Sequence, residues 1–309
     1  MNKFQRDELI KVIYKKAIKN KKICILSADF GAPSLDTFRE KLKSQFYHLG
    51  ISEQNMINVA GGLAIEKNIA FTYAMAPFIS LRCLEQHKIN AMMNLPVINL
   101  VAGVGYGYAN AGPTHYATED YGVLKSIINS TIFTISDGAQ AELIAKKLCE
   151  KPIFCFVRMD RDPLIDIENK HKTTNIDFNN GFRKIFNGKK LLIISHGFML
   201  NKIYFILKKN KLDKYITIID LFRSKPINIK LKNIINKYKK TITFDEQIYG
   251  NDLGSEVLTF INDNNIKSKL KNFSLKEKYE IENGGRQRIL GLNGFSDKNI
   301  LDKIKILMK

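Results

Sequence analysis

Hydrophobic and polar positions in the first half of the chain predict helices and strands in turn. Residues 5–19 place Leu9, Ile10 and Ile13 on one broad face, as an amphipathic helix does. Short apolar runs predict buried strands at 22–29, 69–75, 95–103, 131–135 and 152–158. Between them we expect helices at 53–66, 79–93, 119–128 and 138–149. Repeated βα units of this kind predict a parallel sheet covered by helices on both faces.

A second α/β set follows a polar segment with little periodicity, residues 162–188. It begins with the apolar run KKLLIISHG and continues with strands at 215–220 and 240–245 and helices at 198–209, 227–238 and 253–263. We therefore predict an α/β protein with two three-layer α/β/α domains whose sheets are mainly parallel. The first domain is expected over 1–165 and the second over 189–309, with a linker at 166–188 between them.

Four loops of the first domain are expected at one edge of its sheet. They are SADFGAPS (27–34), the run up to Glu53, the segment after strand 69–75, and GVGYGYANAGPTH (103–115). In an open parallel sheet, ligands bind outside the carboxyl ends of the strands. All four loops carry small residues or unusual polar groups, so this edge is the predicted site.

The stretch GISEQNMINVAGGLA (50–64) places Glu53 at the start of a predicted helix that is otherwise almost uncharged. A helix-start acid contributes only about 0.3–1 kcal/mol through the helix dipole. The next charged residue is Glu66, and a helix without a charged face is typical of a buried element. Burying a carboxylate is costly unless it has a partner, so both a structural and a functional interpretation of Glu53 stay open.

His115 lies in GPTHY, where Gly112 and Pro113 predict a turn that aims the following side chains outward. A lone histidine is more often structural than catalytic, but its place in a loop at the ligand edge favours a functional role. A dinucleotide site is not supported, because GVGYGY is followed too soon by Pro113 to open a helix. The sequence also has no P-loop, HExxH or GxSxG motif.

Composition narrows the class of protein. The chain has 309 residues, 45% of them hydrophobic and 26% charged, which is typical of a globular protein. The N-terminal segment has no apolar signal region and no stretch is long enough to span a membrane, so we expect a cytoplasmic protein without membrane contact. The net charge of +19 comes from lysines spread along the whole chain, which indicates a compositional bias rather than a nucleic-acid surface.

The four cysteines, Cys24, Cys83, Cys149 and Cys155, lie in apolar or mixed segments and form no CxxC pair. We expect them to be buried free thiols. No Cys/His cluster has zinc spacing, and we assign no metal ligand to this chain.

The segments SADFGAPS, GISEQNMINVAGGLA and GPTHYATED, in this order, resemble the pyrimidine-binding domain of transketolase. The related 1-deoxyxylulose-5-phosphate synthase and, more distantly, the E1 β-subunits of 2-oxoacid dehydrogenases are also similar. Past the linker, IDLFRSKPIN, TFDEQIYGNDLGSEV and ENGGRQRILGLNGFS resemble the C-terminal domain of the same family. The resemblance covers nearly the whole chain.

This resemblance implies that Glu53 faces N1′ of the aminopyrimidine of thiamine diphosphate and shares a proton with the ring, and so acts as the catalytic acid. It implies that His115 lines the cleft between cofactor and substrate, as a catalytic and substrate-contacting residue. A full-length transketolase holds the diphosphate and Mg²⁺ through an N-terminal domain with a GDG…N motif, which this sequence lacks. We therefore expect a partner subunit that supplies the diphosphate and Mg²⁺ site, with α2β2 as the default assembly.

Two departures from the family concern the substrate side. Transketolases have an Asp immediately before GPTH that contacts a substrate hydroxyl, and this chain has Ala111 there. A His or Arg that the family uses on substrate groups, about eight residues further upstream, falls near Gly103. A site without these polar groups should not hold the same sugar phosphate equally well. The aromatic residue expected to stack on the pyrimidine is also shifted, since strict spacing falls on Ile79, and we favour its neighbour Phe78.

Four further positions are matched to the family. Asp29 and Ser34 match its SADL…S segment with one extra residue between them. Asp29 is expected on the cofactor side, and Ser34 as a substrate contact. Arg158 matches a position that binds substrate phosphate, with Arg161 as its rival, although either could be a strand-end charge.

Three functions remain open. The first is the C-terminal subunit of a split, transketolase-like enzyme that transfers a two-carbon ketol unit between sugar or sugar-phosphate substrates. The second is a reaction like that of 1-deoxyxylulose-5-phosphate synthase or of a 2-oxoacid E1 β-subunit, with a 2-oxoacid donor; loss of the hydroxyl-contacting Asp is compatible with it, whereas GPTH favours the first. The third is a non-catalytic partner that kept the fold, which the retained Glu53 argues against.

Overall fold

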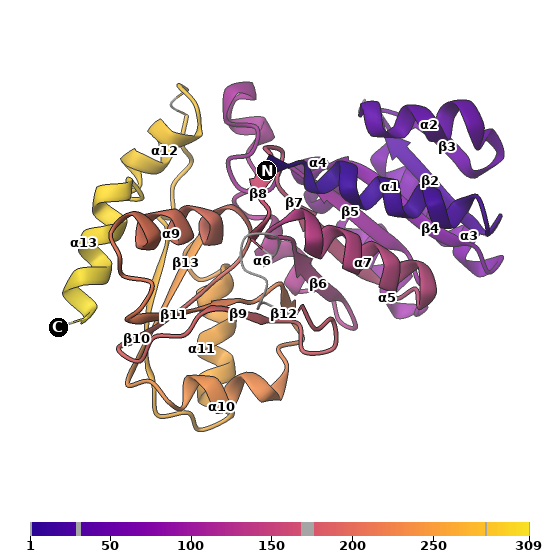
Figure 1. Ribbon diagram of the computed structural model, residues 1–309. Helices are drawn as coiled ribbons and strands as arrows, with labels where there is room; N and C mark the ends of the chain where they lie inside the picture. The colour runs from indigo at the N-terminus through magenta and orange to yellow at the C-terminus, as the bar shows by residue number, and fades with distance from the viewer. Residues whose placement is uncertain (1, 29–31, 168–175, 282, 309) are drawn as a thin grey trace.

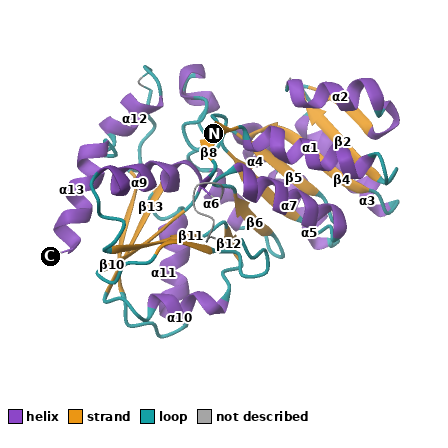
Figure 2. Cartoon of the chain, viewed as in Figure 1, coloured by secondary structure: helices purple, strands orange, loops and turns teal. Residues whose placement is uncertain are grey.

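The computed structural model describes residues 2–28, 32–167, 176–281 and 283–308, and its two main sheets form two α/β halves (Figure 1). Helices flank the strands of both halves, as Figure 2 shows. The predicted α/β class with mainly parallel sheets is confirmed. A small antiparallel pair joins β1 (Asn2–Lys3) to β8 (Leu164–Ile165).

The first half is built on a seven-stranded sheet whose strands are parallel except at one edge. Its order is β12 (Arg223–Lys225), β6 (Thr131–Thr134), β7 (Cys155–Met159), β5 (Ile98–Ala102), β4 (Ile69–Met75), β2 (Ile23–Ala28) and β3 (Phe46–Gly50). The antiparallel edge strand β12 comes from the second half of the sequence. The two predicted domains therefore share a sheet.

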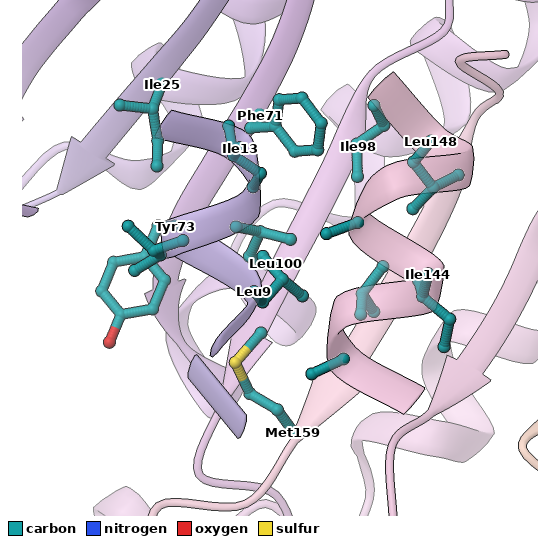
Figure 3. Close-up of a cluster of buried hydrophobic side chains, with 14 of the residues drawn as sticks. Leu9, Ile13, Ile25, Phe71, Tyr73, Ile98, Leu100, Ile144, Leu148 and Met159 are labelled. Carbon is teal, nitrogen blue, oxygen red and sulfur yellow. The ribbon is translucent and has the colours of Figure 1, made fainter. Parts of the chain in front are cut away.

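Helices cover both faces of this sheet, because alternate strand residues point to opposite sides. One face carries α1 (Gln5–Ala17), α2 (Pro33–Lys41) and α7 (Gly138–Glu150). Figure 3 shows this core, where Leu9 and Ile13 of α1 and Ile144 and Leu148 of α7 meet side chains of the central strands. The opposite face carries α3 (Glu53–Ile65), α4 (Ala76–Leu81), α5 (Leu84–Met92) and α6 (Asp120–Lys125).

The second half is built on a five-stranded sheet. Its order is β14 (Lys269–Leu275), β13 (Lys240–Ile248), β10 (Leu191–Ser195), β11 (Ile216–Asp220) and β9 (Arg183–Phe186), with β9 antiparallel. One face packs on α9 (Gly197–Lys209), α12 (Arg286–Leu292) and α13 (Asp297–Met308). The other packs on α10 (Lys232–Ile235) and α11 (Leu253–Asp263). Short 3₁₀ turns occur at Lys43–Gln45, Ala109–Ala111, Pro113–His115 and Ile229–Leu231.

The segment predicted as a linker, 166–188, is partly structured. It contains β9, which pairs with β11 of the second sheet. Arg183 at the start of this strand is fully buried and bridges Asp137 of the first half, at 2.6 Å, and Asp220 of the second, at 3.0 Å. Removing one partner of a buried ion pair leaves the other charge uncompensated, which destabilises the fold. Because its two partners come from different halves, Arg183 stabilises the contact between the halves.

Candidate functional site

Glu53 is the first residue of α3, directly after the loop that leaves β3 at the carboxyl end of the sheet. The preceding Ser52 turns its hydroxyl back to donate to the carbonyl of Leu49, at 2.6 Å. This fixes the entry of the chain into the helix and directs the Glu53 side chain inward. Glu53 is only 4% exposed, so it is a buried acid and not a solvated helix-start charge.

The partner of this acid is Arg82, which the sequence pattern did not reveal. Its Nη1 donates to Oε2 of Glu53 at 2.7 Å, although its own side chain remains 42% exposed. The predicted helix 79–93 is broken here into α4 and α5, and Arg82 lies at the break. The backbone carbonyl of Arg82 accepts a hydrogen bond from Nε2 of Gln54 at 2.9 Å, which ties this break to the start of α3.

Phe78 and His115 line the same cavity as Glu53 and Arg82. The Arg82 guanidinium carbon lies 4.6 Å from the centre of the Phe78 ring. On another side the His115 ring meets the Phe78 ring edge-on, with centroids 5.3 Å apart and planes at 71°. The alternative aromatic position, Ile79, is fully buried in the core, so Phe78 is the side chain that faces the site.

These four residues line one cavity of about 280 Å³, whose wall is completed by Ala28, Ile51, Ala74 and Met75. The lining combines apolar side chains with one buried carboxylate, and this combination suits a flat ring with one basic nitrogen. Nearby Cys83 is fully buried. Burial, reinforced by the negative charge of Glu53, raises the pKa of the Cys83 thiol to about 12, so this cysteine stays protonated at neutral pH.

Two further predicted site residues, Asp29 and Ser34, follow β2 in the sequence. Asp29 lies outside the described residues. Ser34 is in the first turn of α2, and its buried hydroxyl has no hydrogen-bond partner in the part of the chain that the structure describes. It does not line the Glu53 cavity itself.

Arg158 is a buried residue whose guanidinium binds groups of the protein itself. It is 1% exposed, and its Nε and Nη2 bind both oxygens of Asp120 at 2.7 and 2.9 Å while Nη1 donates to Thr134 at 2.8 Å. All three nitrogens are engaged inside the protein, and Arg158 lies outside the Glu53 cavity. Arg158 does line a second cavity, with His196 and Arg286, and its expected contact with substrate phosphate stays a prediction. Arg161 is exposed, with its guanidinium 4.9 Å from the Tyr108 ring centre.

The two departures on the substrate side have different settings. Gly103 has a φ of +79°, and a Cβ there would lie 2.0 Å from the Tyr108 ring. No side chain fits at this position, because the tyrosine occupies the space that the family's polar residue would need. Ala111 is exposed, at the end of a short 3₁₀ turn, and its small side chain leaves the space of the family's Asp unfilled.

The described residues contain no group of three or more His, Cys, Asp or Glu side chains that could hold a metal ion. All four cysteines are free and buried, as expected. Among the helices of the described segments, none has the length and apolarity that crossing a membrane requires.

The chain is similar to known proteins along most of its length. Residues 7–164 match the family model described as transketolase, pyrimidine binding domain. The chain is 25% identical to one of the subunits of the apulose-4-phosphate transketolase of Phocaeicola vulgatus, over 82% of either chain. It is 27% identical to transketolase-like protein 1 of Mus musculus, covering 94% of this chain and 49% of that protein.

Among solved structures, a protein described as "Split gene transketolase, inactive beta4 tetramer" superposes with a TM-score of 0.84. The two chains are 21% identical, and the match covers 100% of this chain and 99% of that one. The chain spans about half the length of the mouse protein and of a 1-deoxy-D-xylulose-5-phosphate synthase from Fusobacterium nucleatum, which it matches at 28% identity.

Proposed function

Because this chain belongs to the transketolase family, we propose that it is the C-terminal, β-like subunit of a two-chain transketolase-like enzyme that uses thiamine diphosphate. The enzyme transfers a two-carbon ketol unit between sugar or sugar-phosphate substrates. The observation that carries this proposal is the buried Glu53 carboxylate beside the Phe78 ring in one cavity.

The cavity fits the aminopyrimidine end of the cofactor. A flat heteroaromatic ring needs an apolar wall and an aromatic face, which Ala74, Met75 and Phe78 supply. A basic ring nitrogen needs one acidic partner in a setting with little water, which Glu53 supplies. When bound, thiamine diphosphate supplies the electron sink for cleaving and forming the carbon–carbon bond.

In this proposal each of the site residues has a distinct role. Glu53, which is almost fully buried, holds a proton between its carboxylate and the ring nitrogen. Phe78 fixes the plane of the ring by stacking. His115 borders Phe78 on the open side and faces the substrate, where Ser34 and the exposed Arg161 are further candidate contacts.

The diphosphate end of the cofactor has no matching site among the described residues. Mg²⁺ prefers carboxylate, carbonyl and phosphate oxygens in octahedral geometry, and the described residues offer no cluster of acidic or other metal-binding side chains. We therefore assign the diphosphate and Mg²⁺ ligands to an N-terminal partner subunit. The match to the Phocaeicola protein covers most of that protein's length, which supports a split arrangement.

Exposed apolar side chains on three helices are compatible with docking of a partner. They are Ile65 of α3, Leu81 of α4, and Ile89 and Met92 of α5. In the proposed α2β2 assembly, side chains of this kind would be covered by the partner subunit or by a second copy of the chain.

A 2-oxoacid donor, as used by 1-deoxyxylulose-5-phosphate synthase or a 2-oxoacid E1 enzyme, is the second candidate. Ala111 and Gly103 favour it, because both positions lack the polar groups that would hold a hydroxylated donor. GPTH, with His115 at the cavity, favours the sugar reaction.

The experiment is to co-purify the chain with a candidate subunit that carries a GDG…N motif. Turnover is then measured with thiamine diphosphate and Mg²⁺, with ketose donors and with pyruvate in parallel. Ketol transfer from a ketose supports the proposal. Turnover with pyruvate alone supports the second candidate, and a stable complex without turnover on any donor supports a non-catalytic partner.

A further inference from the structure

Arg82 contacts the two groups that would bind the cofactor ring in the proposed function, the Glu53 carboxylate and the Phe78 ring. Its guanidinium donates to Glu53 at 2.7 Å and lies 4.6 Å from the centre of the Phe78 ring. A guanidinium is flat, delocalised and rich in N–H donors, and it stacks on aromatic faces. An aminopyrimidine is also flat and carries N–H donors. The arginine is therefore a chemical imitation of the ring.

We propose that Arg82 is a built-in competitor, which covers the Glu53 and Phe78 contacts and must swing out before the ring can take both of them. This inference rests on the proposed function, since it takes Glu53 and Phe78 as the ring's contacts. While Arg82 is in place it holds Oε2 of Glu53 and lies over the Phe78 ring, so an incoming ring can reach only the other carboxylate oxygen and the remaining part of the cavity.

The structure allows this swing as a side-chain movement. The Arg82 backbone is held in place, because its carbonyl accepts from Gln54 and the following Cys83 is fully buried. The Arg82 side chain, by contrast, is 42% exposed and lies at the break between two helices. Leaving the cavity exposes the guanidinium to water, which solvates it well. No helix has to move.

The competition also explains how a buried acid is tolerated in the free chain. Glu53 would otherwise be a carboxylate at 4% exposure without a charged partner, and such a group is costly to bury. Arg82 supplies the missing partner until the ring arrives. When the ring displaces Arg82, its N–H donor replaces that of the guanidinium, so the Glu53 carboxylate keeps a hydrogen-bond partner throughout.

The test measures binding of a neutral ring probe, 4-amino-5-hydroxymethyl-2-methylpyrimidine, to the full chain by ligand-observed NMR. A neutral probe avoids repulsion between Arg82 and the charged thiazolium of thiamine. The variant Arg82→Gln removes the competitor and should bind the probe about tenfold more tightly, equivalent to about 1.4 kcal/mol. Arg82→Lys keeps the charge without the flat stacking group and should bind with intermediate affinity.

Arg39→Gln is a matched control. Arg39 also lies over an aromatic ring, Phe46, at 5.2 Å, and also pairs with a carboxylate, Asp36, but it is outside the cavity. Its loss removes the same charge and should leave probe binding unchanged. Adding Glu53→Gln to Arg82→Gln should abolish the gain, because the gain depends on the freed carboxylate.

Unchanged or weaker binding in Arg82→Gln overturns the competition, as does the absence of probe binding in both the wild type and this variant. A failure of the proposed function is distinguishable. It would appear as an assembled enzyme without turnover that depends on thiamine diphosphate, while Arg82→Gln still tightens probe binding. The reverse pattern, turnover without tightening, rejects only the role of Arg82.

Discussion

Glu53→Gln separates the chemistry of the site from its stability. The substitution keeps the size of the side chain and leaves an amide oxygen to accept from Arg82, but it removes the acid. Removing a group that transfers a proton typically lowers the rate about 10²–10⁴-fold. We therefore expect turnover of the assembled enzyme to fall within that range.

The expected change in stability is small. The carboxylate pairs with Arg82, whose side chain is 42% exposed. Solvent screens a pair of this kind, and exposed ion pairs contribute about 0–1 kcal/mol. The free energy of unfolding should therefore change by about 1 kcal/mol or less, which urea denaturation followed by circular dichroism can measure.

The assay compares Glu53→Gln with Glu66→Gln, which alters an exposed acid at the other end of the same helix. Each variant is purified with the partner subunit, and ketol transfer is followed at saturating thiamine diphosphate and Mg²⁺. Glu66→Gln should keep wild-type turnover. Equal turnover in Glu53→Gln and the wild type would refute the proton-transfer role, and loss of folding in Glu53→Gln would refute the reasoning on stability.

Three further predictions concern the scaffold. Burial lowers the pKa of His87 from 6.5 to about 4, so the folded state keeps this histidine neutral. The contribution of the neutral ring to stability, at most about 3 kcal/mol, is present above pH 6.5 and is lost as the pH falls towards 4. Urea titrations of the wild type and His87→Gln as a function of pH check this, because the free energy of unfolding should depend less on pH in the variant. Gly61→Ala places a Cβ 2.4 Å from an asparagine oxygen of α5 and should cost about 1–3 kcal/mol, whereas Gly62→Ala meets nothing within 4 Å and should stabilise the helix by up to about 1 kcal/mol; thermal unfolding separates them, and equal melting temperatures would contradict the packing. Arg158→Met leaves the fully buried Asp120 without its partner and should destabilise the fold by about 3–5 kcal/mol; a stable variant with only a raised KM would instead show that this arginine binds substrate.

The sequence predicted most of the first sheet because its strands are apolar runs separated by amphipathic helices. Predicted strand 69–75 coincides with β4, and predicted helix 53–66 ends within one residue of α3. It did not predict β12, whose antiparallel pairing with β6 joins residues far apart in the chain. Such pairings depend on tertiary structure and leave no local periodicity.

The candidate site shows the same division. Glu53 and His115 could be assigned to one edge because the carboxyl ends of parallel strands meet there, and the structure places both on one cavity. Arg82 was missed because the stretch 79–93 has the pattern of one continuous helix, without a Gly or Pro to signal a break. The available signal was its spacing, since Arg82 follows Phe78 by four residues, where helical side chains are neighbours.

The two ends of the proposed cofactor make opposite demands, and this chain meets only one of them. The ring end needs apolar side chains, an aromatic face and one acid, which the Glu53 pocket provides. The diphosphate end needs a metal site, which the described residues do not form. Since Arg82 also competes for the ring contacts, binding to the isolated chain should be weak. A docked partner that holds the diphosphate turns ring binding into an intramolecular event at high effective concentration. Assembly can then displace Arg82 from the pocket even if the partner subunit itself makes no contact with Glu53. Cofactor affinity should therefore rise steeply when the two subunits meet.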